Sequence, residues 1–211
     1  MGCQNYREFS IGLQLEKIKN DDETIEKSRV FMETEDLFEY LQRVGVLFKH
    51  VVDDCVSVID RDSLEDIVAA FYDAKNIYLY SLDGRENILE LFLDQMKQAG
   101  KEVILIRSSD DPKALIASMD DKDAILIVSA LEMKEDDVFL DEILKRPCPK
   151  VLVSTADDSD LYSKADHVFY DYPKGNNFIR NSRSVPQVSL LLGLDLLQAA
   201  FVKMTLDRRS E

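Results

Sequence analysis

The run from Ala124 to Val128 constrains the fold of this chain more than any other stretch. It reads Ala-Ile-Leu-Ile-Val, a continuous apolar segment rich in β-branched side chains, and Ser129 follows it directly. An all-apolar strand is typical of a parallel sheet that helices cover on both faces. Ligands of such sheets bind beyond the carboxyl ends of the strands. We therefore expect any ligand of this protein to lie near Ser129.

Strand-like and helix-like segments alternate along most of the chain. The expected strands are residues 76–80, 102–106, 124–128, 150–154 and 167–172, and the expected intervening helices are residues 87–98, 112–119, 136–145 and 158–164. Gly100 is placed to end the first of these helices, and Pro112 opens the second. A long apolar helix is expected from about Val185 to Met204. This alternation predicts an α/β fold with a doubly wound parallel sheet.

A mostly helical segment precedes the first strand. Residues 5–18 are expected to form a short helix, and residues 37–59 a long amphipathic one that tolerates Gly45. The apolar residues of the long helix recur at steps of three and four: Leu37, Leu41, Val44, Phe48, Val51, Cys55 and Ile59. Ser63 and Asp66 resemble a capping box, which would open a further helix.

Charge and cysteine usage narrow the class of protein. Twenty-six basic and 41 acidic residues leave a net charge of -15, which repels a phosphate backbone and argues against nucleic-acid binding by this chain. Cys3, Cys55 and Cys148 lack disulfide or metal spacing, as is typical of a reducing cytosol. Only His50 and His167 could serve a histidine-based zinc site. We expect a cytoplasmic protein without a metal or other cofactor.

Two features argue against targeting to a membrane. The first 20 residues are polar and charged, so they do not resemble a signal peptide. The apolar segment 185–202 contains Asp195 near its middle, and a carboxylate there would be costly in lipid. We expect this segment to be a buried or interface helix.

Three segments, VLVSTADDSDLYSKADHVFY, GLDLLQAAF and GCQNYREF, resemble segments of RpiR-type transcriptional regulators, which carry a helix-turn-helix domain and an SIS (sugar isomerase) domain. The matching positions of the late SIS domain are Thr155, Ser159, Leu161, Ala165 and Asp166, and those of the end of a helix-turn-helix domain are Gly2, Tyr6, Glu8 and Phe9. The closing GLDLLQAAF also resembles the last helix of the family. The resemblance implies a flavodoxin-like α/β/α sandwich with a five-stranded parallel sheet, usually dimeric, that binds phosphosugars at the strand ends. It divides the chain into residues 1–20 (a helix-turn-helix remnant), 21–60 (a helical connector), 61–206 (the SIS domain) and 207–211 (a tail).

The ligand loops depart from the family pattern. The first loop of the family resembles G-x-G-x-S, and here residues 81–85 read SLDGR. The second resembles S-x-S-G-x-T, and here residues 129–134 read SALEMK, which keeps the first serine alone. Close approach of a backbone to phosphate usually needs glycine. The departures therefore predict that ordinary phosphosugars bind weakly.

Four residues are candidate ligand contacts: Ser81, Arg85, Ser129 and Thr155. The serines and the threonine could instead satisfy nearby backbone groups, as strand-end hydroxyls commonly do. Arg85 could grip a phosphate, or it could be solvated or paired with Glu86. No pair of residues stands out as a catalytic couple, and no catalytic residue is predicted.

Carboxylates follow several of the expected strands. They are Asp83, Asp110, Asp111, Glu132, Glu135, Asp136, Asp137, Asp157, Asp158 and Asp160. As a group they could bind a divalent cation. Acidic residues also stabilise helix starts, and that reading covers Asp136, Asp137 and Asp158. We favour the second reading and expect no metal.

The favoured hypothesis is a phosphosugar-sensing or assembly module that lacks its own DNA binding. The alternative is a phosphosugar isomerase of the same fold, and a more distant one is a purely structural dimerisation protein. A homodimer or larger assembly is expected because segment 185–202 is apolar on nearly every helical face. The apolar stripe of residues 37–59 could pack across a two-fold axis.

Overall fold

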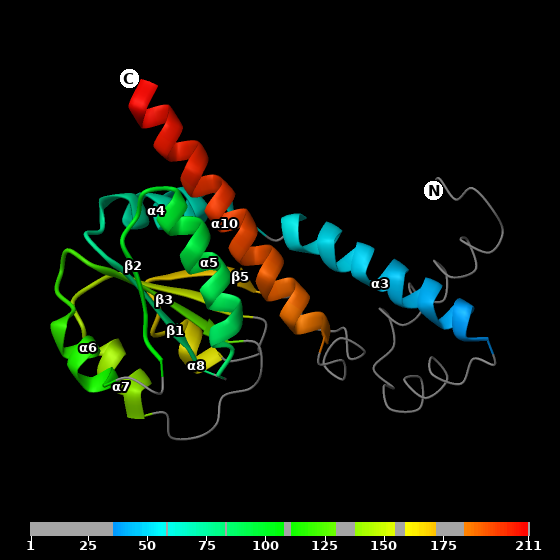
Figure 1. Cartoon of the computed structure of the whole chain (residues 1–211), viewed down its shortest axis with the longest axis horizontal. Helices are drawn as coiled ribbons and strands as arrows, with labels where there is room; N and C mark the ends of the chain where they lie inside the picture. Colours follow the sequence, from blue (N-terminus) through cyan, green and yellow to red (C-terminus); the bar gives the residue numbers. More distant parts are fainter. Residues whose placement is uncertain are drawn as a thin grey trace.

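A five-stranded parallel sheet forms the centre of the molecule (Figure 1). The computed structural model describes residues 36–57, 59–82, 84–107, 111–129, 138–154, 159–171 and 184–210. Its strands are β1 (Ile77–Ser81), β2 (Val103–Leu105), β3 (Ala124–Ser129), β4 (Lys150–Ser154) and β5 (His167–Asp171). Their order in the sheet is β2-β1-β3-β4-β5, and every pair is parallel. The predicted α/β fold and its five-stranded parallel sheet are thus confirmed.

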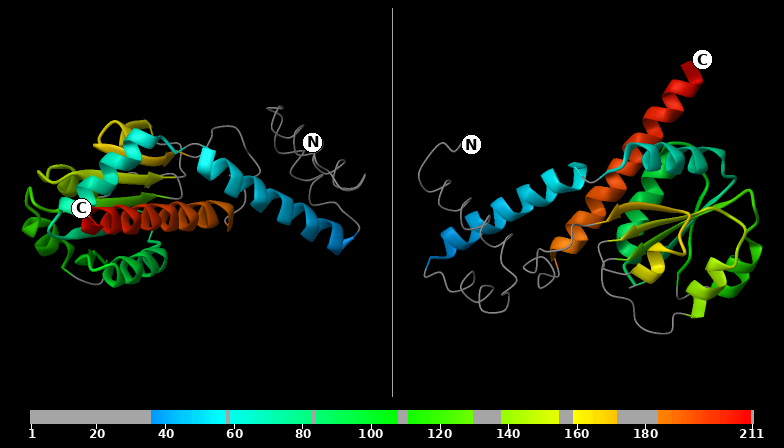
Figure 2. Two further views of the ribbon diagram at one scale, coloured as in Figure 1. Left: turned by 90° about the horizontal axis from the view of Figure 1, so that it is seen from above. Right: turned by 180° about the vertical axis from the view of Figure 1, so that it is seen from behind.

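Helices cover both faces of this sheet (Figure 2). The described helices are α3 (Leu37–Ser57), α4 (Arg61–Asp73), α5 (Glu86–Gln98), α6 (Pro112–Ser118), α7 (Val138–Leu144), α8 (Ser159–Tyr162) and α10 (Ser184–Ser210). Helices α4, α5 and α10 pack on one face, and α6, α7 and α8 pack on the other. The predicted helix over residues 5–18 lies outside the described residues.

Strand β3 is buried along its whole length, as the all-apolar run predicts. Because side chains alternate across a strand, Leu126 and Val128 face the core under α4, α5 and α10, whereas Ile125 and Ile127 face the other core. All four side chains are fully buried. A sheet buried on both faces explains why this segment has no polar residue before Ser129.

Two predicted helix ends, at Gly100 and at Pro112, are confirmed. After α5, Gly100 takes a φ of +86° and donates to Lys97 O at 2.9 Å, while Lys101 N–H donates to Met96 O at 3.1 Å, which is a Schellman motif. Pro112 opens α6, as predicted.

The capping box at Ser63 is not formed. Asp60 caps α4 instead, because its carboxylate accepts the Ser63 N–H at 2.8 Å and so places Ser63 inside the first turn. The predicted helix over residues 37–59 also ends earlier than expected, at Ser57.

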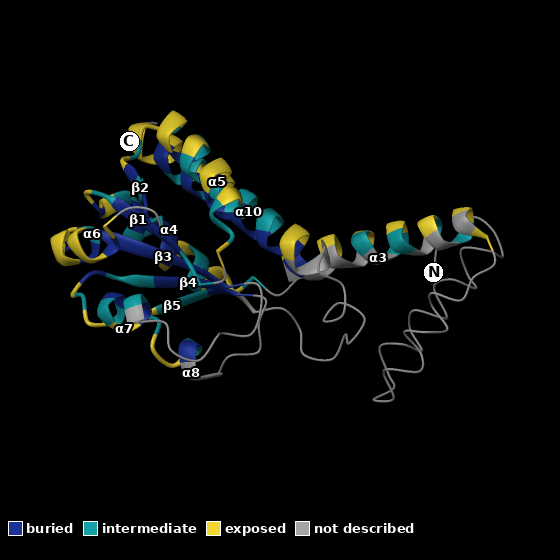
Figure 3. Cartoon of the chain, turned by 60° about the horizontal axis from the view of Figure 1, so that its bottom comes forward, coloured by how far each residue is buried: buried dark blue, intermediate teal, exposed yellow. Residues whose placement is uncertain are grey.

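Helix α3 extends away from the sheet, and its C-terminal part lies against α10 (Figures 1 and 2). Its predicted apolar stripe is divided. Cys55 is fully buried and Phe48 packs against the core, whereas Leu41 is 56% exposed. Exposed residues recur along the described part of α3 in Figure 3. The helix therefore serves both as part of the core and as an exposed arm.

Helix α10 continues past its predicted end at Met204 to Ser210. Within it, Gln187–Arg209 is long and apolar enough to cross a membrane by length and composition. One side of the helix packs in the core through Leu190, Leu194, Leu197 and Phe201. The Asp195 carboxylate accepts a hydrogen bond from Gln95 Nε2 of α5 at 3.2 Å. A helix with an internal packed face and a carboxylate bonded to its neighbour is a core helix of this fold.

Buried polar contacts fix the amino edge of the sheet. The Asp123 carboxylate, only 4% exposed, accepts Asn76 Nδ2 at 2.9 Å and the Asp120 N–H at 3.0 Å. This pair joins the segments that lead into β1 and β3. Lys101 likewise links the start of β2 to α4, since its ammonium donates to Tyr72 O at 2.9 Å and to Ala74 O.

Candidate functional site

The strand order creates a topological switch point between β1 and β3. The chain leaves β1 for α5 on one face of the sheet and leaves β3 for α7 on the other. In open parallel sheets, ligands bind beyond the carboxyl ends of the strands at such a point. Ser81 ends β1 and Ser129 ends β3, and Ser81 lies opposite Val128 in the register. Two of the predicted residues therefore lie at the ends of the two strands that flank the switch point.

Ser129 lies at the end of β3 on the α7 side of the sheet. It follows the alternation of Ile125 and Ile127, and it is fully buried. Ser154 is its partner in the register with β4 and is also fully buried. The two hydroxyl-bearing residues form a pair within the edge of the sheet, and neither is at the protein surface.

Ser154 was not among the predicted ligand residues. The signal was available, because Ser154 ends the predicted fourth strand and Ser129 directly follows the predicted third strand. That Ser154 lies beside Ser129 could be known only from the parallel register of β3 and β4, which places the two strand ends side by side.

Ser81 organises the turn that leads into α5. Its Oγ accepts the Arg85 N–H at 2.8 Å, so one acceptor position of this hydroxyl is used by the backbone of its own loop. Gly84, at a φ of +71°, takes the left-handed conformation that the turn requires. The alternation of Ile77 and Leu79 places Ser81 on the α5 side, on the opposite face from Ser129.

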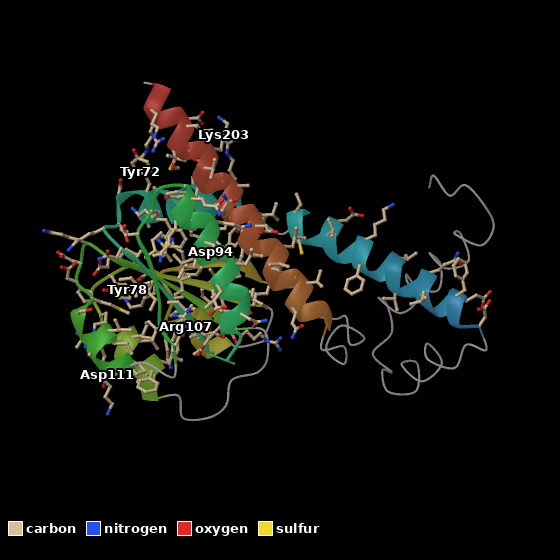
Figure 4. All side chains as sticks on the ribbon, in the orientation of Figure 1. Tyr72, Tyr78, Asp94, Arg107, Asp111 and Lys203 are labelled. Carbon is tan, nitrogen blue, oxygen red and sulfur yellow. The ribbon has the colours of Figure 1, made fainter. Side chains whose placement is uncertain are left out.

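Charged side chains surround the first turns of α5. Arg85 is the half-buried N-cap residue of this helix, and its side chain makes no capping hydrogen bond. Arg107, just after β2, forms an ion pair with Glu90 at 3.0 Å (Figure 4). Arg107 was also absent from the prediction, since only the fold brings β2 beside the second turn of α5. The N-terminal end of α5 therefore carries both basic side chains, Arg85 and Arg107, and the acidic side chain of Glu90.

Several predicted features lie elsewhere or outside the described residues. Thr155 and most of the carboxylates that follow the strands belong to segments that the structure does not describe. Asp111 caps α6 by accepting the Ala114 N–H at 3.2 Å, which supports the helix-start reading for this residue. Across the described ranges, no group of three or more His, Cys, Asp or Glu side chains could hold a metal ion. His167 opens β5, at the amino edge of the sheet.

Two groups with shifted pKa values also lie away from the switch point. Burial raises the pKa of the Cys148 thiol and lowers the pKa of Lys101. Cys148 precedes β4 and Lys101 precedes β2, so both lie at the amino edge. Lys101 has a structural partner in α4. Shifted pKa values often mark functional sites, but here they reflect packing.

Comparison of the sequence with known proteins gives no match. No protein-family model matches the chain. No curated protein matches it either.

Comparison of the structure with solved structures gives many matches. The sugar isomerase domain of an RpiR transcription factor from Sphaerobacter thermophilus has 17% identity and a TM-score of 0.60, covering 76% of this chain and 96% of that one. The Vibrio vulnificus NanR protein complexed with ManNAc-6P has 17% identity and a TM-score of 0.62, covering 99% and 73%.

An enzyme-like neighbour shares the same architecture. It is a Methanococcus jannaschii protein whose structure infers a function of 3-hexulose-6-phosphate isomerase, with 14% identity and a TM-score of 0.56 over 78% of this chain and 91% of that one. At such identities the likeness shows the fold alone. The chain therefore has the five-stranded α/β/α fold of SIS (sugar isomerase) domains.

Proposed function

We propose that this protein is a carbohydrate-derivative sensing or assembly module, similar to the effector domain of RpiR-type regulators, with a degenerate phosphosugar site. The shared fold with an RpiR sugar isomerase domain and with NanR supports this assignment. The main support for a degenerate site is that the serine hydroxyls near the switch point are buried or already hydrogen-bonded within the protein. Ser129 and Ser154 are fully buried, and Ser81 bonds the backbone of its own loop.

A dianionic phosphate needs several converging N–H and hydroxyl donors. Each donor that is lost while its partner stays buried costs about 1–3 kcal/mol. A carboxylate about 4 Å from the phosphate adds roughly 4 kcal/mol of repulsion per pair of charges at an effective dielectric of 20. Glu86 and Glu90 lie in the first two turns of α5, close to where Arg85 replaces the serine of the family loop. Arg85 and Arg107 offset this repulsion in part.

The alternative is a phosphosugar isomerase, which the Methanococcus jannaschii neighbour favours. Such a reaction needs a general acid or base beside the bound sugar. At the described carboxyl edge, Glu90 is paired with Arg107 and Glu86 lies in the first turn of α5, whereas His167 lies at the opposite edge. We therefore favour a module without catalytic activity.

The test is calorimetry with glucosamine 6-phosphate, fructose 6-phosphate, N-acetylmuramic acid 6-phosphate and ManNAc-6P. We expect dissociation constants of about 1 mM or weaker, because the converging donors are few. Low-micromolar binding that disappears in Ser129→Ala but persists in Ser63→Ala, a serine on distant α4, would show a working site. Conversion of fructose 6-phosphate to an aldose phosphate by the wild-type protein would favour the isomerase.

The proposal includes self-association in the cytoplasm. Half-exposed apolar residues of α10 and the exposed arm of α3 provide surface for a second copy. A dimer or tetramer that senses or scaffolds would need no DNA-binding activity of its own.

A further inference from the structure

Helix α3 exposes large apolar side chains near its N-terminal end. Phe38 is 62% exposed and Leu41 is 56% exposed, and exposed Gly45 follows one turn later. These three residues recur at steps of three and four, so they lie on one side of the helix, and we call them the outer strip of α3. A Cβ added at Gly45 would meet no atom of the described chain within 4 Å, so the strip is open there. Exposed apolar side chains grouped on one face are a mark of an interaction surface.

We propose that residues 5–18 of the same chain form a helix that packs antiparallel on the outer strip. The sequence predicts a helix over these residues, which lie outside the described part of the chain. An isolated helix of about 12–15 residues is only marginally stable in water. A helix of this length therefore needs an apolar surface to pack against, and α3 is the next helix along the chain. This inference goes beyond the proposed function and does not depend on the ligand site.

The apolar residues of the segment match the spacing of the outer strip. Ile11, Leu15 and Ile18 recur at steps of four and three. Read from its C-terminal end, the outer strip has the same two steps in the same order. An antiparallel pair therefore places Ile11 against Gly45, Leu15 against Leu41, and Ile18 against Phe38.

Charge favours the same direction. The antiparallel arrangement brings Lys17 and Lys19 to the start of α3, where Asp36 and Glu39 lie. Cations at the C-terminal end of one helix and anions at the N-terminal end of the other also complement the two helix dipoles. A parallel pair would move the two lysines away from this acidic end and lose the attraction.

The covalent connection favours the chain's own segment over a second copy at this surface. Residues 19–35 could extend to about 60 Å, whereas packed helices lie only about 8–10 Å apart. A tethered segment acts at an effective concentration of about 1 mM, roughly a thousand times that of a second copy at micromolar concentration. The segment spans about 21 Å, so it leaves exposed Val52 and Val56, together with α10, for the self-association proposed above.

Cysteine cross-linking tests the pairing. In a Cys3→Ser background, Leu15→Cys with Leu41→Cys should form a disulfide within one chain under mild oxidation, seen as a monomer of altered mobility on a non-reducing gel at every protein concentration. The two remaining cysteines are buried. Leu13→Cys with Leu41→Cys is the matched control, because positions 13 and 15 are almost equally far along the tether but lie about 200° apart around a helix.

Two results of this experiment would overturn the inference. Equal cross-linking of both pairs would mean that the segment is tethered near α3 without packing on it. Covalent dimers whose yield rises with protein concentration would mean that the segment packs on a second copy instead.

Hydrogen exchange tests the packing without new cysteines. Leu15→Asp should raise the exchange rates of the amides of residues 37–45 by roughly tenfold or more, because it removes the cover from this part of α3. Leu13→Asp introduces the same charge on the other side of the segment and should leave these rates unchanged, and the amides of α5 serve as the reference in both variants. Unchanged rates in Leu15→Asp, or an equal rise in Leu13→Asp, would contradict the inference while leaving the proposed ligand function untouched.

Discussion

Lys101 offers a direct test of how the sheet is joined to α4. Its ammonium donates to Tyr72 O at 2.9 Å and to Ala74 O, which are carbonyls at the C-terminal end of that helix. These carbonyls have no partner within the helix, and a cation there also complements the helix dipole. Lys101 is placed for this contact by the Schellman motif at Gly100. Lys101→Met keeps the aliphatic stem and removes the donor.

We expect Lys101→Met to lower the free energy of unfolding by about 2 kcal/mol. Each hydrogen bond from a charged donor contributes about 1.5–3 kcal/mol, but the substitution also relieves the cost of burying the ammonium. For a chain of this size the loss corresponds to a melting temperature lower by about 4–8 °C. Urea unfolding followed by circular dichroism measures it. The control is Lys122→Met, which removes the same charge from an exposed loop residue.

The wild-type protein and Lys101→Met also allow a test based on pH. Burial lowers the pKa of Lys101 from its ordinary 10.5, and the nearby Asp73 carboxylate acts in the opposite direction. Between the lowered folded pKa and the unfolded value, the unfolded chain binds more protons, so the contribution of Lys101 to stability rises with pH. The stability difference between wild type and Lys101→Met should therefore widen as the pH approaches 10.5 from below. A loss no larger than in Lys122→Met, or a gap that narrows with pH, would refute this account.

Two further predictions concern the amino edge and nucleic acid. Asn76→Ala should lower the free energy of unfolding by about 1–3 kcal/mol, because it removes a donor from the buried Asp123 carboxylate, whereas Asn87→Ala at an exposed helix position should not. Urea titrations of both variants would settle the point, and equal midpoints would contradict it. With a net charge of -15, the chain alone should not bind DNA selectively, and salt-sensitive, sequence-selective binding in an anisotropy titration would prove this wrong.

The sequence alone was sufficient to predict the class of the fold. An all-apolar segment such as residues 124–128 must be covered on both faces, and alternation with helices leaves a doubly wound parallel sheet as the consistent solution. The sequence was also sufficient to predict a helix end where the residues that determine that end are close together in the chain. Gly100 and Pro112 act through their own backbone conformations, so their helix ends were predicted correctly.

Prediction failed where two candidates compete for one role. Ser63 and Asp60 can both cap a helix, and the choice depends on which side chain reaches a free N–H in the folded chain. The sequence predicted that the apolar stripe of residues 37–59 forms a single packing surface. Only the position of α10 decides that Cys55 is buried and Leu41 exposed.

In the candidate site, too, some residues could be predicted from local sequence and others only from the tertiary structure. Strand ends can be located in a sequence, so Ser81 and Ser129 were found without the structure. Ser154 and Arg107 gain their meaning from neighbours far away in the sequence, through the β3–β4 register and the Glu90 ion pair. The sequence determined which residues end the strands, because hydrophobic periodicity is local. The tertiary structure alone decided which of them meet and which face inward, because parallel strands are joined by long crossovers whose packing is not encoded in any short segment.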